Sequence, residues 1–117
     1  MNSVSNDRSA ALRDLVELRR PVPVAIAELS RFSWDSETEL IFIEPVNVLN
    51  VLNEYARGAL AERDLIDWAE ALDARDDVGF VAADAPLLRT ALFELSALEL
   101  FGPIGEVVSS IRARLGH

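Results

Sequence analysis

Apolar residues recur three and four positions apart along most of this chain. In the clearest segment, residues 61–75, they form a single stripe: Leu65, Trp68, Ala69 and Leu72. The charged side chains of that segment lie away from the stripe, which is the pattern of an amphipathic α-helix. The spacing therefore predicts a fold built mainly from helices.

Proline, glycine and capping residues mark where the other helices are expected to begin and end. The expected boundaries are Ser9 or Asp7 and Pro21 for the first helix, Pro23 for a short second one, Pro45 and Gly58 for the third, Asp84 and Gly102 for the helix after the amphipathic one, and Ile104 for the last. The helix that follows Asp84 is apolar nearly all round. We therefore place it at the centre of the fold, with Leu88, Leu92 and Leu95 buried.

The run Leu40–Ile43 has the residue types of a short strand, although no pairing strand is evident and an extended buried stretch is the alternative. The expected fold is all-α: a compact bundle of about five helices, with at most one or two very short strands near residues 39–44. No linker or repeat divides the chain. We expect one domain over residues 1–117, with residues 1–7 as a flexible tail.

Length and composition suit one hydrophobic core, with 117 residues, a mass of 12.9 kDa and 50% apolar residues. There is no cysteine, which excludes disulfides and zinc–thiolate sites. Residues 1–8 do not resemble a signal peptide, and no apolar run approaches the ~20 residues that cross a bilayer. A cytoplasmic protein without a membrane association is the simplest expectation.

Catalytic side chains are almost absent. The only histidine is the final residue, His117, and without an internal histidine or a cysteine the usual nucleophile–base pairs cannot be built. The five glycines match neither a dinucleotide fingerprint nor a phosphate-binding loop. We therefore expect a protein that is not an enzyme and that uses no cofactor and no metal.

Three carboxylates near the end of the amphipathic helix allow other interpretations. A carboxylate-dependent metal enzyme would use Asp73, Asp76 and Asp77, but their spacing matches no calcium loop. The simpler alternative is a solvated helix end followed by a turn. A third interpretation is a like-charge pair of Asp73 and Asp77 on one helix face, which costs about 0.3–1 kcal/mol and would be relieved by a cationic partner.

The net charge of −9 comes from 20 acidic and 11 basic residues, and all the basic ones are arginine. Residues 62–84 hold eight acidic side chains and only two arginines. Such a surface repels nucleic-acid phosphates and favours approach of a cationic protein, although acidity also serves simple solubility. The candidate partner-binding residues are Asp67, Glu70, Asp73, Asp76 and Asp77.

The two tryptophans have different expected roles. Trp68 lies on the apolar stripe of the amphipathic helix, so we expect it in the core. Trp34 lies beside a turn, where a lid on the core and an exposed anchor for a partner are both open.

Asp67-Trp68-Ala69 follows an apolar helix and a glycine, and leads into Arg75-Asp76-Asp77-Val78-Gly79-Phe80. Together with Trp34-Asp35-Ser36 and Leu92-Phe93-Glu94-Leu95, this pattern resembles a family of short uncharacterised bacterial proteins. The resemblance implies an all-helical cytoplasmic protein and brings no catalytic residues. In size and charge the chain is also similar to immunity proteins of bacterial toxin systems, including contact-dependent growth inhibition, which neutralise a cognate toxin domain by direct binding.

These observations lead to two functional hypotheses. The first is a non-enzymatic immunity protein that binds a cationic toxin domain through its acidic residues. The second is an adaptor or regulatory module that self-associates or docks a helix through an apolar groove, with an exposed patch built from Trp34, Phe42, Leu100 or Phe101.

Overall fold

The computed structural model describes residues 3–73 and 75–116, and places six α-helices and one pair of strands within them. The His117 discussed above lies outside the described residues. The elements are α1 (Ser3–Val16), α2 (Val22–Leu29), β1 (Ile41–Ile43), α3 (Pro45–Ala56), α4 (Glu62–Leu72), β2 (Val78–Phe80), α5 (Ala85–Ser96) and α6 (Ile104–Leu115). Short 3₁₀ turns, Ala82–Asp84 and Leu98–Leu100, flank α5.

The predicted helical architecture is confirmed, but the helix count is six and not about five. The expected strand near residues 39–44 is present as β1. Its partner, β2, lies far outside that range: the two strands pair in parallel, with Ile41 opposite Val78 and Ile43 opposite Phe80. The apolar residues after Asp77, which had no strand-like alternation, take extended geometry because β1 offers them a ladder of backbone partners.

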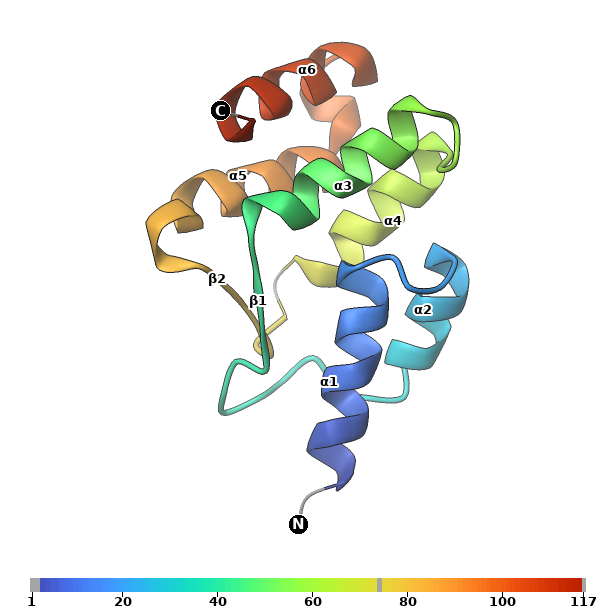
Figure 1. The fold of residues 1–117 in the computed structure, drawn as a ribbon, viewed down its shortest axis with the longest axis vertical. Helices are drawn as coiled ribbons and strands as arrows, with labels where there is room; N and C mark the ends of the chain where they lie inside the picture. Colours follow the sequence, from blue (N-terminus) through green and yellow to red (C-terminus); the bar gives the residue numbers. More distant parts are fainter. Residues whose placement is uncertain (1–2, 74, 117) are drawn as a thin grey trace.

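The helices form an elongated body with extents of 45 × 29 × 23 Å. In Figure 1, α1 and α2 lie side by side at one end of the long axis, and α6 lies at the other. Between them, α5 contacts α3, α4, α6 and β2, which is the central place predicted for it. The radius of gyration of 13.7 Å is that of a single compact chain of this length, for which about 13 Å is expected.

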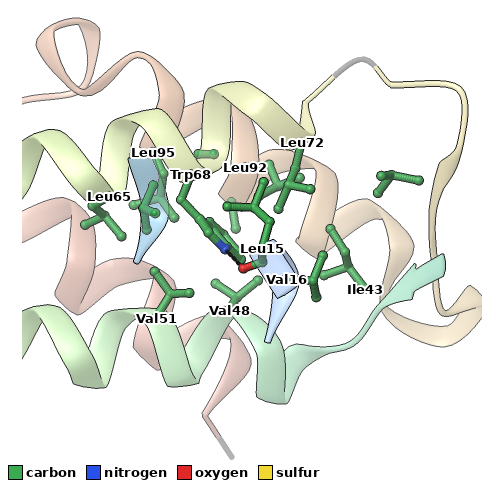
Figure 2. Packing of buried hydrophobic residues seen from close by; sticks show 14 of the residues in the cluster. Leu15, Val16, Ile43, Val48, Val51, Leu65, Trp68, Leu72, Leu92 and Leu95 are labelled. Atoms are coloured by element: carbon green, nitrogen blue, oxygen red, sulfur yellow. Dashed lines mark hydrogen bonds between the residues drawn. The ribbon is translucent and has the colours of Figure 1, made fainter. Parts of the chain in front are cut away.

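The core is centred on Trp68, which is completely buried as its place on the apolar stripe predicted. Figure 2 shows its indole among side chains of four other elements, including Leu15 of α1 and Val48 of α3. The indole nitrogen donates a hydrogen bond to the Leu15 carbonyl at 2.8 Å. This bond satisfies the only polar atom of the side chain and ties α4 to α1.

Helix ends differ in places from the predicted ones. The first helix begins at Ser3, within the segment expected as a flexible tail and before the predicted caps Asp7 and Ser9. Gly58 has a φ of +86° after α3, as expected for a glycine that ends a helix. Asp84 precedes α5 as predicted, but its side chain makes no capping hydrogen bond.

The end of α4 is the most consequential difference. The helix stops at Leu72, and Asp73 is already extended, with a ψ of 137°. The predicted continuation to residue 75 is therefore wrong. Asp73 and Asp77 do not share a helix face, and the like-charge pair considered above does not form.

None of the described helices is both long enough and apolar enough to span a membrane.

Candidate functional site

An open groove with a volume of about 770 Å³ lies between α2 and α4. Its position follows from the shortness of α2, which packs against α4 and α1 but leaves the side of α4 away from the core partly uncovered. The lining residues are Pro23, Ile26, Ala27, Ser30, Trp34, Asp67, Glu70 and Ala71.

The groove combines an apolar lining with two carboxylates. Ile26 and Ala27 come from α2, and Ala71 from α4; their small or aliphatic side chains leave room for a ligand. Asp67 forms an ion pair with Arg63, in which Arg63 Nη2 lies 2.8 Å from Asp67 Oδ1. Glu70 is exposed and has no ion-pair partner among the described residues. The lining contains no basic residue, so the groove presents negative charge beside apolar surface.

Trp34 forms one wall of the groove and is 49% exposed. Its ring lies 5.2 Å from the guanidinium carbon of Arg75, a cation–π distance. Its backbone carbonyl accepts a hydrogen bond from the Asp76 amide at 3.0 Å. The structure leaves Trp34 exposed, with its indole against the buried Arg75. Its role as an anchor for a partner stays a prediction.

Next to Trp34 lies an ionic cluster in which Arg75 and Asp77 are buried and Arg8 is half-buried. Arg75 binds both carboxylate oxygens of Asp77, through Nε at 2.9 Å and Nη2 at 3.0 Å. Arg8 Nε donates to Oδ2 of the same carboxylate at 2.7 Å. Two arginines thus bind one carboxylate, which joins α1 to the turn before β2.

Backbone carbonyls complete the cluster. Ser33 O accepts from Arg8 at 2.6 Å and from Arg75 at 3.0 Å, and Asp35 O accepts from Arg8 at 2.7 Å. No buried side-chain polar atom in the described part of the chain lacks a partner. The cluster therefore fixes the loop that carries Trp34.

Asp77 is fully buried, so its predicted place on a partner-binding surface is wrong. Burial by itself would raise the pKa of its carboxyl, but the hydrogen bonds and charges of Arg75 and Arg8 outweigh that effect and the pKa is lowered. The side chain stays ionised in the interior because two guanidinium groups replace the lost water.

The other four candidate residues lie in three places. Asp67 and Glu70 line the groove. Asp76 is exposed and borders a separate polar hollow with Arg8 and Asp35, and Asp73 is half-buried at the end of α4. The structure thus brings together two of the predicted residues with Trp34, and not the five as one surface.

Sequence reasoning missed Arg8, Arg75 and the α2 side of the groove. Arg75 and Asp77 are two positions apart before an apolar strand, a spacing that suits a local buried ion pair. Arg8 carries no such signal, because it is 69 residues from Asp77 in sequence. Only the packing of α1 brings them into contact.

The exposed aromatic residues of the second hypothesis do not form one patch. Phe42 lies on β1, whereas Phe101 packs edge-to-face on Phe93 of α5, with ring centroids 5.5 Å apart. The segment between α5 and α6, which holds Leu100 and Phe101, is far along the long axis from the loop of residues 30–40 (Figure 1). In the groove, by contrast, the exposed Trp34 lies beside two of the predicted acidic residues.

The three carboxylates proposed above for a metal site lie apart. Within residues 3–73 and 75–116, no group of three or more histidine, cysteine or acidic side chains is arranged to hold a metal ion. The cluster of Asp73, Asp76 and Asp77 is dispersed, since Asp77 points into the protein and pairs with arginine.

Comparison of the chain with protein-family models, with curated proteins and with solved structures gives no match. The resemblance drawn from the Asp67-Trp68-Ala69 pattern remains a prediction, and any function assigned to the chain depends on the geometry above.

Proposed function

We propose that this protein acts by binding another protein, as an immunity protein that neutralises a cognate cationic toxin domain. The observation that supports this most directly is the groove between α2 and α4. There, two carboxylates and a half-exposed tryptophan converge on an apolar lining. Apolar anchors beside charge are typical of protein-binding surfaces.

Charge supports a cationic partner. The net charge is −9, and the groove lining adds Asp67 and Glu70 with no basic residue. Opposite potentials speed the encounter of two proteins, whereas the tightness of the complex depends more on buried contacts. The acidic residues would therefore steer the toxin domain, and Trp34 with the apolar lining would hold it.

The proposal is tested with the protein encoded by the neighbouring gene, expressed as its isolated basic domain. Titration calorimetry in about 0.05 M and about 0.3 M NaCl should give a one-to-one complex that weakens with salt, because the Debye length falls below about 10 Å over this range. Coexpression of the two proteins should restore growth of cells that the domain alone inhibits.

A variant with four reversed charges provides the second arm: Asp67→Lys, Glu70→Lys, Asp73→Lys and Asp76→Lys. Asp77 is left unchanged because its substitution would disturb the fold. We expect the association rate to fall more than tenfold and its dependence on salt to disappear. Absence of a complex, or a complex that is indifferent to these four charges, would overturn the proposal.

A further inference from the structure

We infer that the groove between α2 and α4 holds a short partner segment that presents an arginine next to an apolar side chain. This inference rests on the proposed function and adds the chemistry that the groove selects. It concerns a local anchor, whereas the proposed function concerns the whole complex.

Arginine fits the charged side of the groove. Glu70 has no cationic partner in the described ranges, and Asp67 shares its charge with the exposed Arg63. A planar guanidinium pairs with a carboxylate through two hydrogen bonds and also stacks on an indole, neither of which a lysine ammonium does as well. Trp34 already stacks on one guanidinium, that of Arg75, and is still 49% exposed.

An apolar neighbour fits the rest of the groove. Ile26, Ala27 and Ala71 line the groove together with the two carboxylates, and they provide aliphatic surface with no side-chain hydrogen-bonding group. A volume of about 770 Å³ holds more than one side chain. A basic segment without apolar side chains would leave the aliphatic surface of the groove in water. The complex would then lack the free energy gained by burying that surface.

The groove is already formed before a partner arrives. Trp34 is held by its stacking on Arg75 and by the hydrogen bond from the Asp76 amide to its carbonyl. Arg75 in turn is fixed by Asp77 and by the Ser33 carbonyl. Little conformational freedom is lost on binding at such a preorganised wall, which favours affinity.

The test uses three short blocked peptides: alternating arginine and leucine, alternating lysine and leucine, and alternating arginine and serine. Binding is followed by ¹H–¹⁵N NMR of the two indole groups, since the chain has two tryptophans. The arginine–leucine peptide should shift the Trp34 indole signal and leave that of Trp68, whose N–H is bonded to Leu15 O. It should bind about tenfold more tightly than either of the other two peptides.

Two charge-matched variants separate the groove from general attraction by an acidic protein. The pair Asp67→Asn and Glu70→Gln should weaken binding of the arginine–leucine peptide about tenfold. The pair Glu99→Gln and Glu106→Gln removes the same charge from exposed positions around the start of α6 and should change it less than about twofold. Thermal unfolding of each variant checks that the fold is retained.

Equal effects of the two pairs, no shift of the Trp34 signal, or equal binding of the three peptides would overturn the inference. Calorimetry of the neighbouring-gene domain separates a failure of this inference from a failure of the proposed function. If that domain binds while the groove variants have no effect, the inference fails and the proposed function stands. If the peptide result holds and the domain does not bind, the inference stands and the toxin partner is wrong.

Discussion

Asp77 and Arg75 are buried among hydrophobic side chains, and within the described part of the chain they are the buried charged residues. An isolated carboxylate would not stay ionised there, because its desolvation costs several kcal/mol. Arg75 and Arg8 offset this penalty with three hydrogen bonds from their side chains. Asp77 lies in an acidic segment of the sequence, but in the structure it connects α1 to the turn before β2.

Asp77→Asn should destabilise the protein by about 3–5 kcal/mol, since the buried Arg75 and the half-buried Arg8 lose their counter-charge. The neighbouring Asp76→Asn is the matched control: that side chain is exposed, and a change within about 0.5 kcal/mol is expected. Urea unfolding followed by circular dichroism measures both. A loss below 1 kcal/mol for Asp77→Asn would contradict this account of the cluster.

The stability difference caused by Asp77→Asn should also depend on pH. The lowered pKa of Asp77 means that its contribution to stability is present above the unfolded value of about 3.9. It is lost as the pH falls through the lower pKa of the folded state. The difference in unfolding free energy between the natural chain and Asp77→Asn should therefore be constant above about pH 5 and shrink below about pH 4.

At the scale of single elements, the end of α1 is unusual. Leu18 has a φ of +55°, in the left-handed region where glycine is the usual residue. The amide of Leu18 bonds to Leu15 O at 3.2 Å, and that of Arg19 to Asp14 O at 2.9 Å, which together are the Schellman pattern of a helix end. Leucine is retained there because its side chain packs on the core.

Two substitutions separate the backbone effect from the packing effect at this helix end. Leu18→Ala loses the packing and keeps the strained backbone, whereas Leu18→Gly loses the packing and relieves the strain. We expect the glycine variant to be more stable than the alanine variant by about 1 kcal/mol. Thermal or urea unfolding checks the order, and an alanine variant at least as stable as the glycine one would contradict it.

The elements also show what the sequence can and cannot predict. The helices have periodic apolar residues of their own, in a stripe for α4 and on nearly all sides for α5, so their existence follows from local residues. Trp68 is placed in the core by its position on the stripe of α4. Strand β2 has no local signal, because its conformation depends on β1, which precedes it by two helices. The groove is harder still: Asp67 and Glu70 are predicted as acidic, but their meeting with Trp34 and Ile26 depends on how α2 packs.

At the scale of the whole molecule, nine uncompensated negative charges are spread over a body 45 Å long. Exposed ion pairs such as Arg63–Asp67 and Arg57–Glu54 stabilise it little, because water and salt screen the attraction between the charges. Added salt therefore acts on the fold mainly by screening the repulsion between the excess carboxylates, because that repulsion acts across the whole surface.

Raising NaCl from about 0.01 M to about 0.1 M should increase the unfolding midpoint by about 4 °C, as the Debye length falls from about 30 Å to about 10 Å. Differential scanning calorimetry provides the measurement. The Glu99→Gln and Glu106→Gln variant, with two fewer charges, should show a smaller increase. A midpoint that falls with salt would mean that the ion pairs dominate.

The parallel pairing of β1 and β2 has a consequence for the order of assembly. Parallel neighbours cannot be joined by a tight hairpin, and here the connection consists of α3, α4 and their turns. The entropy of closing so long a loop is recovered only when the intervening helices have already docked. We therefore expect the strand pairing to form late in folding, after the helices between the two strands have packed together.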